Sequence, residues 1–268
     1  MRGILPTLFV MTPLTLIGQF NLDATTSAFA AQRERLNSAD SLYLQGQKQS
    51  ACNIYYTLLM HYPKNWRFIL RSIRCISNIE SSNIELIKYL YTHGISSDSI
   101  ATDVIIGPKL SAELSQTGGT LFPESRYSSM LDSIAIVDQQ VRSGRVSESE
   151  MIRTDSLHYQ QLIRCFRDTG QYINSRASIL VLTHSLSLHP NDIPYVVALL
   201  NEALLNGSID PETYALIVDH TFYGIFRCVP FGVFGSDKVK LPRCVEDHTT
   251  ELYRTRLLGA QRSDMFAK

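Results

Sequence analysis

Apolar residues in the stretch 128–142 recur at the spacing of one helix face. Met130, Ile134, Val137 and Val141 are separated by four, three and four residues. That period is typical of an amphipathic helix with a buried stripe. We therefore predict a helix over this stretch, with these four residues facing the core.

Polar side chains lie beside that predicted stripe. Asp138 and Arg142 are four residues apart, so they can pair along the helix surface, and Gln139 adds an amide that can donate and accept. Polar groups at the margin of a buried face need partners. This helix is therefore the best candidate for a functional site.

The rest of the second half, up to residue 268, contains further stretches of the same kind. Thr154 or Asp155 can cap a helix that Gly170 ends, and Asp210 can cap another. The predicted core positions of the four helices after the first are Tyr159, Leu162, Ile163 and Phe166; Ala177, Leu180, Val181, His184 and Leu188; Ile193, Val196, Val197, Leu200 and Leu204; and Tyr214, Ile217, Val218 and Thr221. No stretch alternates with period two for long, so residues 128–268 are expected to form an all-α domain of five or six helices.

The stretch 31–95 has a different helical pattern. Its small and large residues resemble one tetratricopeptide repeat, a helical hairpin, at Ala39, Leu42, Gly46, Ala51, Tyr55, Leu58 and Pro63. A third helix from Trp66 and a fourth ending at Gly94 would complete a second hairpin. Such a unit either offers a shallow groove to a peptide or packs as an adaptor on the next domain. Residues 96–127 contain Thr117-Gly-Gly-Thr120 and Pro123, which favour a linker.

The first thirty residues resemble a secretory leader. Arg2 precedes an uncharged, mostly apolar run over residues 3–18, which is short for a membrane span and is interrupted by prolines. Cleavage is expected after Gly18 or after Ala30; an uncleaved membrane anchor is the alternative. We expect an exported protein, periplasmic or secreted, with no stable membrane span once the leader is removed.

Charge and cysteine content narrow the possible partners. Lys plus Arg equals Asp plus Glu at 25 each, so no global field favours nucleic acid. Of the five cysteines, Cys228 and Cys244 flank a loop-like segment that a disulfide between them would close. Cys165 lies in an apolar helical stretch, where a buried free thiol is expected.

Several candidate residues allow both a catalytic and a structural interpretation. His184 falls on an apolar stripe, where it is either a core residue or a general base oriented by Asp138 or Asp219. Arg142 would bind an anionic group in the first case and only pair with Asp138 in the second. Tyr214 needs a partner for its hydroxyl, which Asp219 or Arg142 could supply. No nucleophile motif, phosphate loop or metal-ligand spacing is present, so neither a cofactor nor a metal is expected.

Several short motifs, in this order, resemble an uncharacterised family of bacterial helical domains of unknown function. They are Asp138-Gln139-x-x-Arg142, His184, Asp210-Pro-Glu-x-Tyr214-Ala215-x-x-x-Asp219, Tyr223-Gly224 and Arg256-x-x-Gly259. Ile225 and Phe226 stand where that family has a glutamine, and Ala260 stands where it has a leucine. The resemblance implies a fold, with tetratricopeptide-like helices before it, and no reaction.

Together these patterns favour an exported interaction or scaffold module of the cell envelope that binds a protein or peptide. The alternative is a hydrolase-like enzyme that uses His184 with Asp138 or Asp219.

Overall fold

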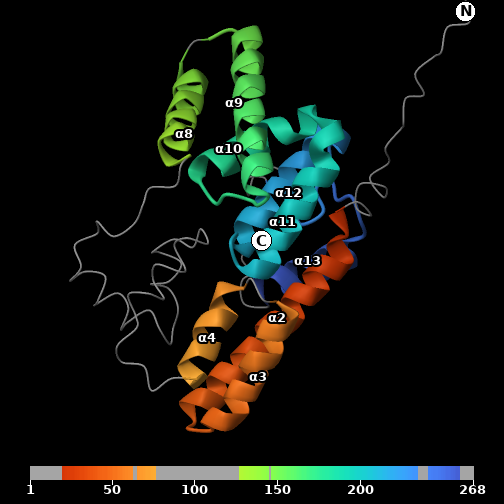
Figure 1. Ribbon diagram of the computed structural model, residues 1–268. Helices are drawn as coiled ribbons and strands as arrows, with labels where there is room; N and C mark the ends of the chain where they lie inside the picture. Colours follow the sequence, from red (N-terminus) through yellow and green to blue (C-terminus); the bar gives the residue numbers. More distant parts are fainter. Residues whose placement is uncertain (1–19, 63–64, 77–126, 145, 235–240, 260–268) are drawn as a thin grey trace, which may run out of the picture.

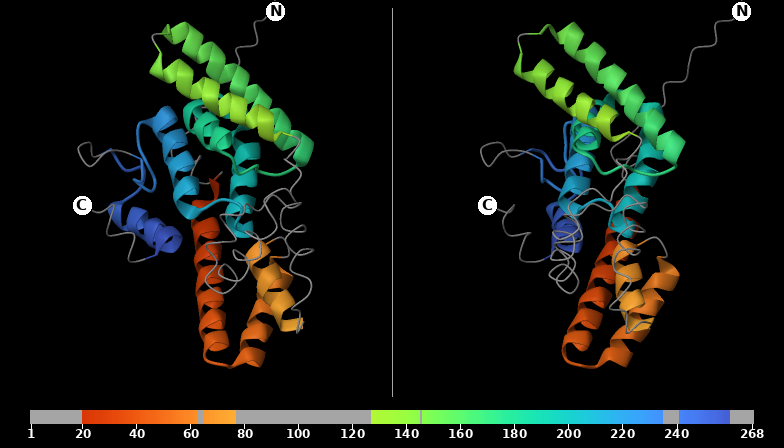
Figure 2. Two further views of the ribbon diagram at one scale, coloured as in Figure 1. Left: turned by 90° about the vertical axis from the view of Figure 1, so that its left-hand side faces the viewer. Right: turned by 60° about the vertical axis from the view of Figure 1, so that its left-hand side comes forward.

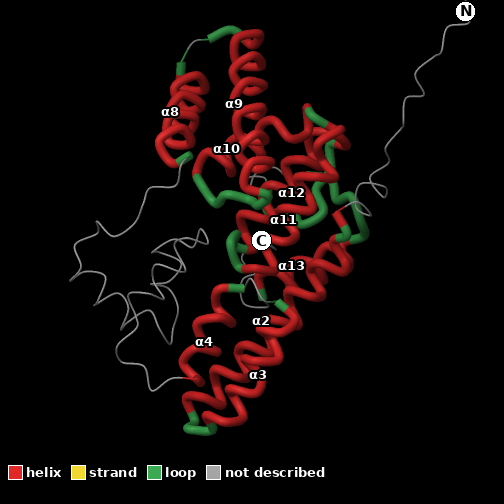
Figure 3. Tube along the Cα trace, in the orientation of Figure 1, coloured by secondary structure: helices red, strands yellow, loops and turns green. Residues whose placement is uncertain are grey.

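The computed structural model describes residues 20–62, 65–76, 127–144, 146–234 and 241–259. Within these ranges the protein is all-α, because all of its regular secondary structure is helical and no strand occurs (Figure 3). This confirms the expected fold class at that level. The predicted helix ending at Gly94 and the predicted linker up to residue 126 lie outside the described residues.

Three N-terminal helices form a small unit with its own core. Helix α2 (Leu22–Leu44) and helix α3 (Lys48–His61) make a hairpin, and helix α4 (Trp66–Ile76) packs on α3. Gly46 has a φ of +81° in the tight turn between the first two, a conformation that glycine adopts without strain. The buried residues of this core are Leu36, Ala39, Ala51, Tyr55, Leu58 and Phe68. A disulfide between Cys52 and Cys75 joins α3 to α4.

A partly buried ion pair also ties α2 to α4. Arg71 donates to both carboxylate oxygens of Asp40, over 2.6 and 2.7 Å, and its side chain is almost fully buried. The hydroxyl of Tyr55 donates to the same carboxylate over 2.7 Å. These three contacts supply the partners that a carboxylate needs when it is removed from water.

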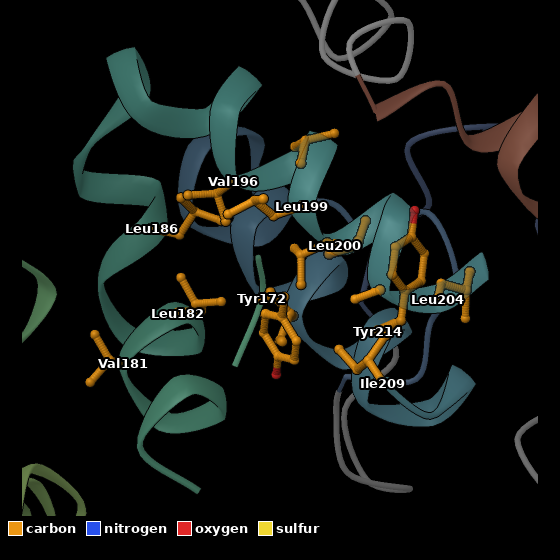
Figure 4. Close-up of a cluster of buried hydrophobic side chains, with 14 of the residues drawn as sticks. Tyr172, Val181, Leu182, Leu186, Val196, Leu199, Leu200, Leu204, Ile209 and Tyr214 are labelled. Carbon is orange, nitrogen blue, oxygen red and sulfur yellow. The ribbon is translucent and has the colours of Figure 1, made fainter. Parts of the chain in front are cut away.

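Six further helices form the main body of the protein (Figures 1 and 2). They are α8 (Ser128–Ser143), α9 (Glu148–Thr169), α10 (Arg176–Ser185), α11 (Ile193–Asn206), α12 (Pro211–Phe226) and α13 (Asp247–Leu258), with two 3₁₀ turns, η1 (Leu186–Leu188) and η2 (Pro190–Asp192), between α10 and α11. Side chains of α10, α11 and α12 meet in the centre of this body (Figure 4). The α8 and α9 helices project from one end of the body, and α3 and α4 lie at the other (Figure 1).

Helix α2 belongs to both cores. At its start, Phe20 and Leu22 are fully buried in the main core, where Phe20 packs on Phe222 of α12. Further along, Arg33 donates to the carbonyl oxygens of Leu257 and Thr255. It thus provides hydrogen-bond donors for carbonyl groups in the last turn of α13. Residues 20–30, which the sequence pattern assigned to a leader, are therefore part of the folded core. The leader boundary at residue 30 stays a prediction, and the burial of Phe20 and Leu22 favours an earlier boundary.

Several predicted helix ends agree with the structure. The side chain of Asp210 caps α12 by accepting from the Thr213 amide over 2.8 Å. Gly170 ends α9 with a φ of +67°, as predicted, and Gly207 ends α11 in the same way with a φ of +73°. The start of α9 differs: Ser147 is the cap, so Thr154 and Asp155 lie inside the helix. No proline or glycine interrupts residues 148–154, which allows the helix to begin earlier.

The buried face of α8 is rotated from the predicted one. Leu131, Ile134 and Ala135 face the core, whereas Val137 is 39% exposed. The next inward position on this face is Asp138, which is 2% exposed. Hydrophobicity alone placed Val137 inside, but the structure buries the charged residue next to it.

The close approach of η1 to α12 explains the glycine at position 224. A methyl group added there would lie 2.3 Å from the Ser187 hydroxyl oxygen and 2.5 Å from its Cβ. We expect Gly224→Ala to lower the free energy of unfolding by about 2 kcal/mol, because the two elements must separate. Chemical denaturation measures this change. The double variant Gly224→Ala with Ser187→Gly should recover most of the loss; an equal loss in both variants would contradict the proposed clash.

Candidate functional site

Charged side chains from three helices meet around Asp138 of α8. Arg142, one turn along α8, has Nε 3.2 Å from Asp138 Oδ2, and its Nη2 lies 2.7 Å from Oδ1 of Asp155 on α9. His184 in the last turn of α10 has Nδ1 3.5 Å from Asp138 Oδ1, a charge contact longer than an aligned hydrogen bond. We call these four residues the Asp138 cluster.

Helix geometry explains why these side chains meet. Asp138 and Arg142 are four residues apart on α8, so both lie on the side of that helix that faces its neighbours. Asp155 and His158 are three residues apart on α9 and share a face in the same way. Helix α10 packs against both α8 and α9 and brings His184 to Asp138.

The carboxyl group of Asp138 is held in its charged form. Burial alone would raise its pKa, but the polar contacts and positive charges of His184 and Arg142 outweigh burial and lower the pKa to about 2. Gln139 also donates to Asp138 Oδ2, over 3.1 Å. Gln139 and Arg142, which the sequence predicted as binding residues, thus donate hydrogen bonds to the carboxylate of Asp138.

His158 is a buried neighbour of this cluster. Its side chain is 5% exposed, and its Nδ1 has no hydrogen-bond partner among the described residues. Burial lowers the pKa of His158, although the nearby carboxylates of Asp138 and Asp155 favour its charged form and Arg142 opposes it. The sequence analysis passed over Asp155 and His158. Their three-residue spacing beside the buried stripe of α9 is the signal that could have identified them.

Asp219 is not part of this cluster. It is fully buried on α12 and accepts hydrogen bonds from three backbone amides, those of Phe231, Val233 and Phe234, over 2.6 to 3.0 Å. Burial raises its pKa to about 6, while the amides favour the charged form. The expected pairing of Asp219 with His184 is wrong, because both oxygens bind the loop after α12.

Tyr214 is likewise a core residue. Its hydroxyl donates to Asn201 Oδ1 over 2.8 Å, and the Asn201 amide donates to the carbonyl oxygen of Phe20 over 2.9 Å. The sequence suggested Asp219 or Arg142 as the partner of the Tyr214 hydroxyl. The structure shows Asn201 instead. Tyr214 connects α12 through α11 to the segment just before α2.

The loop held by Asp219 is also closed covalently. A disulfide joins Cys228 and Cys244, the two cysteines singled out in the sequence, and Val229 pairs with the backbone on the opposite side of the loop. Cys165 is a free thiol buried in α9, as expected. The described parts of this loop are thus fixed to α12, and they carry no residue of the Asp138 cluster.

His220 of α12 lies near His184. Burial lowers its pKa to about 4, and the proximity of His184 acts in the same direction. Its ring is 3.7 Å, centre to centre, from that of Phe234 in the anchored loop. The Asp138 cluster is thus bordered by a second imidazole on the α12 side.

The arrangement supports proton binding more directly than metal or phosphate binding. Among the described residues, no group of three or more His, Cys, Asp or Glu side chains is placed to hold a metal ion. The Arg142 guanidinium is already engaged by two carboxylates. His184 remains partly exposed, and its Nδ1 lies 3.5 Å from Asp138 Oδ1, so the imidazole is the group of this cluster that can take up a proton from outside.

No protein-family model, curated protein or solved structure matches this chain. The resemblance to the family of helical domains therefore stays a prediction.

Removing the guanidinium should leave the Asp138 charge buried with too few partners. We expect Arg142→Met to lower the free energy of unfolding by about 3 kcal/mol, measured by chemical denaturation at pH 7. The matched control is Arg153→Met on the exposed side of α9, with a change within about 0.5 kcal/mol. Adding Asp138→Leu to Arg142→Met should restore much of the stability; no recovery would show that Arg142 acts through other contacts.

Proposed function

We propose that the protein is an exported helical module that binds a protein or peptide partner in the cell envelope. The observation that carries this proposal is the N-terminal unit of α2, α3 and α4. It has a core separate from the main one, and a disulfide and a partly buried ion pair make it rigid. Preformed helical surfaces of this kind bind partners at a low cost in ordering.

Tetratricopeptide-like packing of α2 on α3 supports the same proposal. Ala39 and Ala51 are fully buried where the two helices meet, and Tyr55 fills the space beside them. Small residues at helix contacts and a large residue in the gap are what the repeat pattern requires. We infer a repeat-like hairpin that serves as an adaptor or as part of a peptide-binding surface.

Export is supported by the cysteines. Four of the five are paired in two disulfides, one in each part of the protein. Disulfides persist in oxidising compartments and are rare where thiols are kept reduced. No described helix has both the length and the apolar character needed to cross a membrane.

The Asp138 and His184 contact favours a second candidate, a hydrolase-like enzyme with His184 as general base. A carboxylate behind a partly exposed imidazole can fix its tautomer and orientation. If this is its role, His184→Gln should abolish function in cells that lack the native copy, with little change in thermal stability. An unchanged cellular phenotype with lowered stability would assign His184 a structural role.

Partner binding is tested by site-specific photocrosslinking of the full chain in cells. A crosslinking amino acid at Met60, which is 82% exposed on α3, should capture a defined partner. The control position is Leu188, exposed in the main body. Capture at both sites alike, or at neither, would contradict recognition by the N-terminal unit.

The mature N-terminus should lie before Phe20. Cleavage after Ala30 would remove Phe20 and Leu22 from the core, at about 1.5 to 3 kcal/mol for each side chain. We therefore expect cleavage after Gly18, which intact mass measurement of the exported protein would show. A chain that starts at residue 31 should unfold at a much lower temperature than one that starts at residue 19; equal stability would remove the argument.

A further inference from the structure

The helices α8 and α9 are attached to the body largely through α10. Both pack on α10, and the Asp138 cluster lies where the three helices meet. In Figure 2 the two helices lie across one end of the body. The second half of α9 is also held there, by Tyr159 stacked on His189 and Arg167 paired with Asp192, whereas α8 has no such anchor among the described contacts. Any change in charge at this junction acts on the attachment of the projecting pair.

The junction holds more ionisable groups than its ion pairs use. Helix α8 contributes Asp138 and Arg142, α9 contributes Asp155 and His158, α10 contributes His184, and α12 contributes His220. The His158 ring is buried, and its Nδ1 has no acceptor among the described residues. A proton added to that ring would place a cation beside Arg142 without a hydrogen-bond acceptor for Nδ1.

We propose that this junction is a proton-sensitive latch, in which protonation of His158 at mildly acidic pH loosens α8 and α9 from α10. In the open state, the His158 ring meets water and binds a proton at its ordinary pKa of about 6.5. In the closed state, burial opposes that proton. Acid therefore favours the open state.

The direction follows from proton binding in the two states. Burial lowers the pKa of His158 in the closed form, so the open form binds more protons once the pH falls below about 6.5. His220 lies on α12, where its ring packs on Phe234, and α12 stays in place, so the response is assigned to His158. Asp138, with a pKa of about 2, stays charged throughout this window and keeps its pairing with Arg142.

Opening would uncover an apolar surface. The inward face of α8 carries Leu131, Ile134 and Ala135, which are buried in the closed form. The latch would thus control access to a second surface, separate from the N-terminal unit. This inference does not depend on the partner proposed for that unit.

Hydrogen exchange of the full chain at pH 7.5 and pH 5.5, corrected for intrinsic rates, tests the latch. For wild type, we expect opening of α8 and the first half of α9 to increase up to about tenfold at pH 5.5, because one histidine is released from burial. Protection in α11 and α12 should stay unchanged. A uniform loss of protection across the chain would overturn the proposal.

Replacing the histidine removes the proton-binding group. His158→Phe keeps the size of the ring, and the pH dependence of α8 exchange should disappear; persistence would overturn the proposal. His248→Gln, at an exposed position on α13, is the control and should behave like wild type. Should His158→Phe fail to fold, wild type and His184→Gln are compared by the same measurement. Retention of the α8 pH response in His184→Gln supports His158, and its loss overturns the assignment to His158.

Discussion

A carboxylate that is buried must find hydrogen-bond donors or positive charges, and the second half of this protein is arranged around that requirement at Asp138. The side chain is 2% exposed, yet its pKa is low, because Arg142 and His184 approach it from two helices. Asp155 in turn binds the other end of the guanidinium. An apolar residue at position 138 would need none of these neighbours. The charge therefore fixes how α8, α9 and α10 can pack, at some cost in stability.

Similar requirements are met differently at the partly buried Asp40 and the fully buried Asp219. Asp40 is paired with an arginine and a tyrosine, whereas Asp219 is surrounded by backbone amides of one loop. The contacts of Asp40 join α2 to α4, whereas the contacts of Asp219 fix the loop that follows α12. Of these three acids, Asp138 is the one with histidines near it, His184 at 3.5 Å and the buried His158 of α9.

Much of the helical architecture could be predicted from residue spacing and capping residues. The stripes of α9, α11 and α12 were found because their buried residues are apolar, and Asp210, Gly170 and Gly207 mark helix ends by local chemistry. The face of α8 was misplaced because a charged residue occupies an inward position. Periodicity cannot reveal this, since the partner of that residue lies on another helix.

The candidate site was predicted in part for the same reason. Asp138, Arg142 and His184 do meet. The partners of Asp219 are backbone amides, and a pattern of side chains in the sequence cannot predict such partners. Tyr214 binds Asn201, and Asn201 binds the backbone of Phe20, nearly two hundred residues earlier in the chain. Contacts over such separations depend on the assembled fold. Local sequence therefore supplied the candidates and could not assign their partners.

The contact between Arg33 and the end of α13 joins positions 224 residues apart. Because α2 and α13 both contribute to the main core, that core is complete only when these two distant segments have met. Long-range closure of this kind slows folding. Until Arg33 reaches this helix end, the carbonyl oxygens of Thr255 and Leu257 have no partner from the first part of the chain.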